Sequence, residues 1–223
     1  MTNPDLIFLS KVYPFWGRLD AGEREYLLAH TRECSYEKGA HVYQGLQGCT
    51  GVLAVRSGQL RVYLLSEEGK EITLYRLIEG DVCLLSASCI LKNISFNSYV
   101  DAETETEVYL TDPQSYGELR QRNSEVEAFT SEMISSRFSD AMWVMEQVVF
   151  MKFDRRLAIF LLEQLALEDS DTVTLTHEQI AKHLGSAREV VTRMLKYFQS
   201  EGIVSVSRRG IQVLDEKRLY ALT

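Results

Sequence analysis

Four polar side chains within two helical turns have the clearest potential for chemistry: Arg188, Glu189, Thr192 and Arg193. Positions 188 and 192, and positions 189 and 193, are i,i+4 neighbours, so a helix places all four on one face. An arginine on such a face can donate two hydrogen bonds to guanine O6 and N7, and a glutamate can accept one from cytosine N4. The spacing therefore predicts a helix that reads base edges in the major groove of DNA.

The flanking residues predict that this helix is the second of a helix-turn-helix. A first helix is expected over 176–184, because a threonine that can cap it precedes residues whose apolar side chains fall on one face. Gly185 follows and supplies the tight turn that the motif needs. Ser186 is expected to cap the second helix, which runs over 187–198.

A basic hairpin is predicted after the second helix. Residues 203–214 alternate like paired strands, with Arg208, Arg209 and Gly210 at the tip, where cations can reach phosphates. Taken one at a time, such charges are also typical of a solvated surface or of a surface i,i+4 pair. The full set of predicted DNA contacts is Ser186, Arg188, Glu189, Thr192, Arg193, Lys196, Arg208 and Arg209.

The charge distribution separates the chain into an acidic body and a basic tail. The 223 residues carry a net charge of −8, which by itself argues against a nucleic-acid partner. Residues 172–223, however, contain 8 Lys and Arg against 5 Asp and Glu, a net +3, so the remainder carries −11. The only basic region is the one that contains the predicted helix-turn-helix, which favours DNA as the partner.

A long helix is predicted before this region, because residues 124–150 contain neither glycine nor proline. Apolar side chains recur there at alternating spacings of four and three: Ile134, Phe138, Ala141, Met145 and Val148. That pattern is typical of a coiled-coil seam, although packing against the rest of the same subunit would also use such a stripe. Further apolar residues widen the stripe, so we expect both kinds of contact.

The sequence before the long helix predicts a small antiparallel barrel or jelly roll over 36–112. Strand-like runs occur at 51–56, 60–65 and 71–76. Glycine-containing turns at Ser57-Gly58, Glu68-Gly69 and Glu79-Gly80-Asp81 bound them, and these are expected to close hairpins. Many short strands at near-even spacing favour a closed sheet, which leaves no edges exposed.

Together these features resemble the Crp/Fnr family of transcription regulators over nearly the whole chain. The most diagnostic segment is Arg188-Glu189-x-x-x-Arg193, and the segments 37–39, 55–58 and 79–81 add to it. The resemblance implies an α+β fold: a double-stranded β-helix or jelly-roll sensor barrel (1–112), a dimerisation helix (113–150) and a winged helix-turn-helix (151–223). It also implies a homodimer on a palindromic TGTGA-like DNA site, with RNA polymerase as a further partner and allosteric control by an effector.

Cyclic AMP is not the expected effector. The family residues that hold its ribose and phosphate are a Gly-Glu pair and an Arg-Ser pair, and the resemblance places Leu84, Leu85, Phe96 and Asn97 at those positions. A cyclic phosphate needs charge-assisted donors, and apolar replacements would leave the anion unpaired. The purine-contacting helix positions appear as Ala141 and Met142, which removes further polar partners.

The sequence also bears on two metal-containing kinds of sensor. An iron–sulfur cluster of the kind found in oxygen-sensing relatives is not expected, because no cysteine precedes Cys34. In haem-sensing relatives the ligands fall near the segment that runs here from Cys83 to Cys89, which is out of register and contains no histidine. Haem stays an alternative if folding brings His30 or His41 close.

The remaining hypothesis is a largely apolar effector pocket that takes an apolar ligand, haem, or an oxidant acting on thiols. Its expected lining is Cys83, Leu84, Leu85, Cys89, Phe96, Asn97 and Met142. The competing interpretation is that the two cysteines are structural, because cysteine is among the residue types most often buried. No Cys-x-x-Cys pair occurs, so neither a zinc site nor another metal site is predicted.

Other functional classes fit the sequence less well. A cupin-type enzyme would need a cluster of histidine and carboxylate ligands, and His41 is the only histidine in the predicted barrel, so no enzyme activity is expected. A ligand-binding or scaffolding protein that uses its helix-turn-helix for protein contacts remains the alternative. The sequence shows no signal-peptide pattern and no apolar run of membrane-spanning length, which predicts a cytoplasmic protein without a membrane partner.

Overall fold

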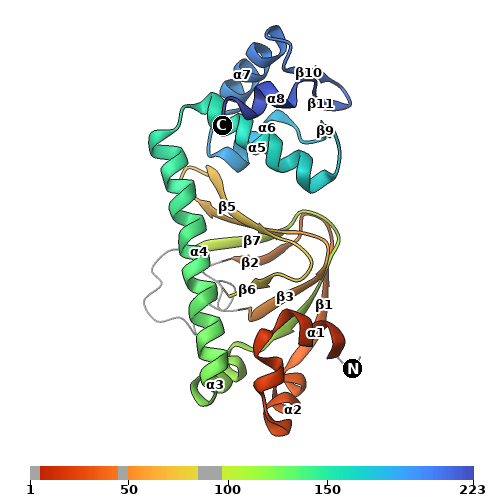
Figure 1. Ribbon diagram of the computed structural model, residues 1–223, viewed down its shortest axis with the longest axis vertical. Helices are drawn as coiled ribbons and strands as arrows, with labels where there is room; N and C mark the ends of the chain where they lie inside the picture. The colour runs from red at the N-terminus through yellow and green to blue at the C-terminus, as the bar shows by residue number, and fades with distance from the viewer. Residues whose placement is uncertain (1–5, 45–49, 85–96) are drawn as a thin grey trace. The chain divides into compact units, whose positions relative to one another are not determined.

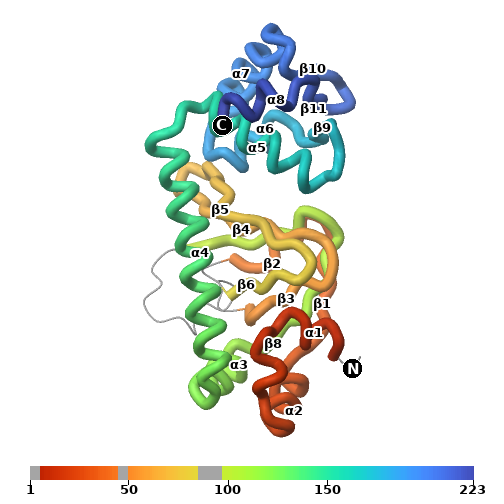
Figure 2. The backbone as a smooth tube through the Cα atoms, in the orientation of Figure 1, coloured from red at the N-terminus to blue at the C-terminus, as the bar shows by residue number. Residues whose placement is uncertain are grey.

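The computed structural model describes residues 6–44, 50–84 and 97–223, and its backbone is drawn in Figures 1 and 2. The chain forms two compact units. The first consists of Met1–Leu65 and Leu74–Ala141, and the second of Ser66–Thr73 and Met142–Thr223. Among the helices that this structure describes, none is both long and apolar enough to cross a membrane.

Two four-stranded sheets form the barrel, which belongs to the first unit except for Ser66–Thr73, the end of the β4–β5 hairpin. Their strand orders are β1-β8-β3-β6 and β2-β7-β4-β5. The strands are β1 (Thr31–Tyr36), β2 (His41–Gln44), β3 (Val52–Ser57), β4 (Leu60–Leu65), β5 (Glu71–Leu77), β6 (Val82–Cys83), β7 (Ser98–Ala102) and β8 (Thr106–Thr111). This architecture confirms the predicted jelly roll, and three strands lie within a residue of the runs read from the sequence.

The core of the barrel follows from period-two patterning. Along β7, buried residues alternate with partly exposed ones, so Ser98, Val100 and Ala102 face inward. Val62 on β4 pairs with Val100 in the antiparallel register, and both side chains are fully buried. Apolar side chains from both sheets therefore close one continuous core.

The connections between strands correct one expectation. Of the three turns predicted to close hairpins in the barrel, the one at Glu68-Gly69 joins two strands that are neighbours in one sheet, β4 and β5. The turns at 57–58 and 79–81 carry the chain from one sheet to the other, so they do not close hairpins. Gly58 has φ +86°, and a Cβ there would lie 2.3 Å from the Glu105 carbonyl oxygen, so its glycine serves a close backbone approach.

Four helical segments flank the barrel: α1 (Leu6–Val12), the 3₁₀ helix η1 (Pro14–Arg18), α2 (Ala21–Ala29) and α3 (Pro113–Arg122). Helix α4 (Ser124–Phe150) has the predicted length. Its first turns pack against the barrel core through Val126 and Phe129, and the Phe129 ring lies 5.3 Å from that of Phe15. The expected contact between the long helix and its own subunit is thus present.

The second unit contains a compact α/β fold after α4. Its elements are α5 (Phe153–Glu168), β9 (Thr172–Val173), α6 (His177–Leu184), α7 (Arg188–Ser200), β10 (Val204–Ser207), β11 (Gly210–Val213) and α8 (Glu216–Tyr220). The three strands form a small sheet in the order β10-β11-β9. Leu161, Ile180 and Leu195 are fully buried in its core, which joins α5, α6 and α7.

Candidate nucleic-acid interface

Helix α6 begins and ends as the sequence predicts. Thr176 caps it: its Oγ1 accepts a hydrogen bond from the Gln179 backbone N–H at 3.2 Å, and the Gln179 side chain accepts one from the Thr176 N–H at 2.8 Å. This reciprocal pair is a capping box. Gly185 ends the helix with φ 60°, a left-handed conformation that lets the chain turn sharply into α7.

The predicted cap of the second helix is wrong. Helix α7 begins at Arg188, its N-cap residue is Ala187, and no side chain caps it. The backbone N–H of Ser186 donates to the Ala181 carbonyl at 2.9 Å, so Ser186 belongs to the turn that closes α6. The reason is that the turn needs two residues beyond Gly185 before helical hydrogen bonding resumes, with Val190 N–H donating to the Ala187 carbonyl.

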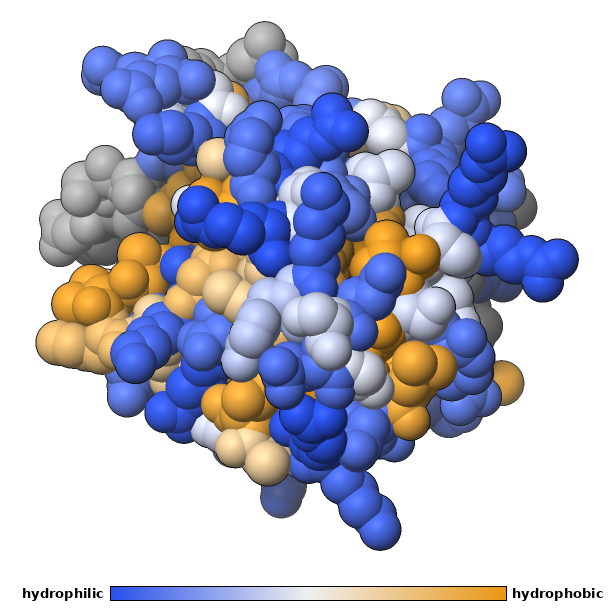
Figure 3. All heavy atoms as spheres, turned by 90° about the horizontal axis from the view of Figure 1, so that it is seen from above, coloured by the Kyte–Doolittle hydropathy of each residue, from blue (hydrophilic) through white to orange (hydrophobic). Residues whose placement is uncertain are grey.

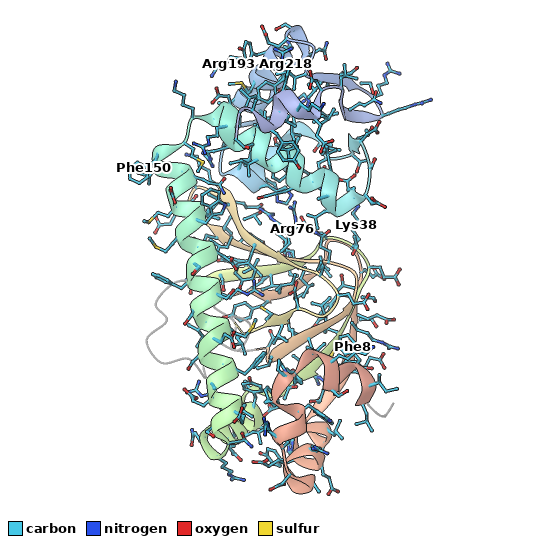
Figure 4. All side chains as sticks on the ribbon, viewed as in Figure 1. Phe8, Lys38, Arg76, Phe150, Arg193 and Arg218 are labelled. Carbon is cyan, nitrogen blue, oxygen red and sulfur yellow. The ribbon has the colours of Figure 1, made fainter. Side chains whose placement is uncertain are left out.

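Helix α7 separates an apolar face from a polar one. Val191, Leu195 and Phe198 are fully buried in the core of the second unit. On the opposite face the side chains of Arg188, Glu189, Arg193 and Lys196 are exposed, and Thr192 is partly exposed. The structure thus brings the predicted recognition residues together on one accessible face. Figure 4 labels Arg193 on this helix, and the view from above in Figure 3 shows many hydrophilic side chains.

The wing is a tight hairpin. Strands β10 and β11 pair antiparallel with Ser207 opposite Gly210, so Arg208 and Arg209 form the turn, and both are exposed. Gly210 has φ +135°, and a Cβ at this position would lie 2.4 Å from the Val173 carbonyl oxygen. Only glycine therefore allows β9 to approach the hairpin this closely.

A cleft of about 500 Å³ lies between the start of α6, the start of α7 and the wing. Its ionisable lining residues are His177, Glu178, Arg188 and Arg208. His177 was not among the predicted site residues. The Nδ1 atom of His177 lies 2.9 Å from Thr192 Oγ1, which joins the first residue of α6 to the polar face of α7. Helical spacing within α7 could not reveal a contact that crosses between two helices.

Helix α4 exposes most of its predicted seam. Ile134, Phe138, Met145 and Val148 have exposed fractions between 38% and 66%. Met133, by contrast, is partly buried against the barrel core. A row of large apolar side chains left in water is typical of a surface that another protein chain covers.

The predicted effector residues fall into three groups. Cys83 and Leu84 are buried in the barrel core, with Cys83 fully inaccessible. Asn97 and Met142 are exposed. Leu85, Cys89 and Phe96 lie outside the described residues. The burial of Cys83 fits a structural cysteine, because thiol oxidation requires access of the oxidant.

Near Cys83, the barrel and α4 contribute a stacked pair that the sequence did not indicate. The Arg137 guanidinium carbon lies 4.4 Å from the centre of the Tyr75 ring, and Arg137 Nη1 donates to Asp140 Oδ2 at 3.0 Å. Burial, followed by the nearby Cys83, raises the pKa of Tyr75 well above its usual value. In the described part of the chain the Tyr75 hydroxyl and Arg137 Nε are buried without a hydrogen-bond partner.

The two histidines that are candidate haem ligands, His30 and His41, have other partners. His30 Nδ1 lies 2.7 Å from the Tyr26 carbonyl oxygen, and His41 Nδ1 lies 2.7 Å from Asp101 Oδ1. Within residues 6–44, 50–84 and 97–223 there is no group of three or more His, Cys, Asp or Glu side chains placed to hold a metal ion. The described residues therefore offer no preformed metal centre.

Comparison with known proteins gives two matches to domain families. Residues 33–123 match the family described as a cyclic nucleotide-binding domain, and residues 155–222 match the family described as a Crp-like helix-turn-helix domain. The first match covers the barrel and α3, and the second covers the part of the chain that holds the cleft and the wing.

Individual proteins match over most of the chain. A putative Crp/Fnr-family transcriptional regulator from Eubacterium rectale ATCC 33656 is 44% identical, with a TM-score of 0.92 over 95% of this chain and 98% of that one. FixK2 from Bradyrhizobium japonicum is 24% identical with a TM-score of 0.69, over 86% of this chain and 96% of that one, and shares the fold. The cAMP-activated global transcriptional regulator CRP from Salmonella typhimurium LT2 is 25% identical over 196 residues, 85% of this chain and 92% of that protein.

Proposed function

Because this chain belongs to the Crp/Fnr family of DNA-binding transcription regulators, we propose that it binds a palindromic DNA site with TGTGA-like arms as an effector-responsive homodimer. The observation that carries this proposal is the exposed face of α7. Arg188, Glu189 and Arg193 project from its first two turns while the opposite face is fully buried. The helix therefore packs on the core through one face and presents donors and an acceptor outward on the other.

The proposed roles follow from hydrogen-bonding chemistry. Arg188 and Arg193 would donate to O6 and N7 of guanines, and Glu189 would accept from the N4 amino group of a cytosine. Lys196, Arg208 and Arg209, with Ser186 in the turn, would contact phosphates and so set the register of the protein on the duplex. Thr192, whose hydroxyl donates to the Arg188 carbonyl oxygen, would contact the bases through its methyl group. The net positive charge of residues 172–223 supports the proposed contacts with phosphates.

The exposed seam of α4 supports the proposed dimer. Two copies of Ile134, Phe138 and Met145 packed across a two-fold axis would remove these side chains from water. Recognition of a palindromic DNA site also requires a two-fold axis in the protein. The two recognition helices must then lie about 34 Å apart, one turn of DNA, to enter successive major grooves. An effector that prefers one arrangement of α4 would shift the population of dimers with that spacing.

The effector is proposed to differ from cyclic AMP. The Salmonella relative is named for activation by cyclic AMP, and the barrel of this chain matches a cyclic nucleotide-binding domain. Leu84 is buried, apolar and next to the described end of β6, where the family resemblance places a ligand-binding glycine. We propose a small-molecule or redox effector, RNA polymerase as a partner, and a cytoplasmic location, with functional domains at 1–112, 113–150 and 151–223.

Selection of sites from a random duplex library tests this function. The purified protein is used with reduced and with oxidised thiols, with and without a cell extract that can supply an effector. Enrichment of a palindrome with TGTGA-like arms is the expected result, and a difference between the redox conditions would identify thiol chemistry as the signal. Failure to enrich any sequence, together with no salt-dependent binding to random duplex DNA, would contradict the proposal and favour a scaffold that uses its helix-turn-helix for protein contacts.

A further inference from the structure

The side chain of His177 joins the two helices of the helix-turn-helix. It is the first residue of α6 and is half-buried, and its Nδ1 lies 2.9 Å from the Thr192 hydroxyl on α7. The same hydroxyl donates to the Arg188 carbonyl oxygen, also at 2.9 Å. A threonine hydroxyl has one hydrogen, so while it is given to that carbonyl, the bond with His177 must use the hydrogen on Nδ1.

This assignment leaves Nε2 as the ring nitrogen open to a ligand. Among the residues that the structure describes, none forms a hydrogen bond with Nε2, and His177 lines the cleft between α6, α7 and the wing. When the ring is neutral, Nε2 carries no hydrogen and presents a lone pair. When the ring is protonated, Nε2 becomes a charged donor, whereas the bond from Nδ1 to Thr192 is unchanged.

The surroundings of His177 disfavour the proton until an anion arrives. Burial lowers the pKa of His177, and the Arg188 guanidinium lowers it further. The other charged groups that line the cleft are Arg208 from the wing and Glu178 from α6. An anion placed between Arg188, Arg208 and His177 would reverse the balance, because it attracts the imidazolium that Arg188 repels.

We propose that His177 is a proton-linked phosphate contact: it positions Thr192 on the recognition helix and, once protonated, donates from Nε2 to a DNA phosphodiester in the cleft. This inference rests on the proposed DNA-binding face of α7. It adds His177 to the residues that contact DNA. It also makes DNA binding depend on pH, because each protomer takes up a proton at His177 as it binds DNA. By linkage, affinity for DNA rises as the pH falls through the pKa of the bound histidine.

Protonation of His177 strengthens DNA binding in this proposal, but it lowers the stability of the free protein. Because folding lowers the pKa of His177, the folded state holds the proton less tightly than the unfolded chain does. Protonation therefore lowers the stability of the free protein as the pH falls below the unfolded value. A purely structural histidine would show this loss alone, whereas a phosphate contact also shows tighter DNA binding in the same pH range.

The test measures the affinity of the full-length protein for the palindromic duplex by fluorescence anisotropy from pH 8.0 to 5.5, at constant ionic strength and in the conditions that enriched that duplex. Wild-type affinity is expected to rise about tenfold between pH 7.5 and 6.0, which requires that the upward pKa shifts of the two His177 side chains in the dimer sum to at least about one unit. His177→Gln keeps an amide donor for Thr192 but cannot be charged, so its affinity should not change with pH. His177→Arg, which is always charged, should bind tightly throughout the range.

His41→Gln is the matched control, because His41 is an exposed histidine of the barrel that pairs with Asp101. It should retain the wild-type pH profile. A flat wild-type profile, or an unchanged slope in His177→Gln, would overturn the proposal while leaving DNA binding intact. Absence of wild-type binding at every pH would overturn the proposed function as well. If His177→Gln does not fold, an NMR titration of the wild-type His177 ring with and without the duplex decides, since the pKa must rise on binding.

Discussion

The two halves of the molecule that are expected to meet ligands are organised differently. On α7 the candidate DNA contacts are close in sequence, exposed, and supported from behind by a buried face of the same helix. In the barrel, the groups around the predicted effector residue Cys83 on β6 come from separate elements: Tyr75 from β5 and Arg137 from α4. The spacing of residues along one helix predicts the first arrangement, but it cannot predict the second, whose residues come from three separate elements.

The two regions also differ in whether their polar side chains contribute to the stability of the free protein. Arg193 is exposed, so its removal should affect a partner and leave folding nearly unchanged. Polar groups of the barrel region such as Tyr116 and Asp112 bond to their own chain, so their removal should affect folding first. Four predictions, from the largest expected effect to the smallest, test this contrast.

The buried face of α7 should carry the stability of the second unit. Leu195 is fully buried, and Leu195→Ala is expected to lower the free energy of unfolding of that unit by about 2–5 kcal/mol, because the truncation leaves a cavity. Hydrogen exchange read by mass spectrometry should show faster exchange in α6 and α7. Leu53→Ala on β3 is the matched core variant of the barrel and should accelerate exchange there instead. If either variant accelerated hydrogen exchange equally in both units, the expectation that each core stabilises its own unit would be wrong.

The exposed face of α7 should affect DNA alone. Arg193→Ala is expected to weaken specific binding by about 1–3 kcal/mol and to relax the choice at one base pair, without a change in thermal stability. Site selection and anisotropy measure the two effects. Arg218→Ala is the control, because Arg218 belongs to α8 and its guanidinium bonds to Glu201. If Arg193→Ala retained full base preference, the assigned role of Arg193 would be wrong.

Helix caps in the two regions should differ in their response to acid. The Asp112 carboxylate caps α3 and accepts hydrogen bonds from Ser115, whose backbone N–H contributes most to the lowered pKa of Asp112. A lowered pKa means that this stabilisation is present above the unfolded pKa and is lost as the pH falls through the folded one. Asp112→Ala should cost about 1 kcal/mol of stability at neutral pH and less in acid, where the carboxyl is neutral.

Thr176→Ala removes a cap that does not titrate, so its cost, also about 1 kcal/mol, should be present at every pH at which the protein folds. Urea unfolding at a series of pH values compares the two variants. A parallel pH dependence in both would show that the Asp112 charge is not responsible.

Two tyrosines of the first unit should respond oppositely to loss of the hydroxyl. The Tyr116 hydroxyl lies 3.0 Å from Thr130 Oγ1, so Tyr116→Phe should cost about 1 kcal/mol of stability. The buried Tyr75 hydroxyl has no partner in the described part of the chain, so Tyr75→Phe should be neutral or slightly stabilising. Thermal unfolding measures both, and a clear loss in Tyr75→Phe would reveal a bonded hydroxyl.

The sequence by itself determined the elements whose periodicity is local. It predicted α4 over 124–150, the helix-turn-helix with its capping threonine and Gly185, and the paired strands of the wing, because helical and strand periods are properties of consecutive residues. The family resemblance extended this to the fold class, which the comparisons confirm.

Only the tertiary structure decided which distant residues meet. It placed the turns at 57–58 and 79–81 between two sheets, moved the N-cap of α7 from Ser186 to Ala187, and brought His177 to Thr192 across two helices. Strand alternation defines the face of a residue but not its partner strand, and a side-chain contact between helices depends on how they cross. These relations arise from packing, which no local period encodes.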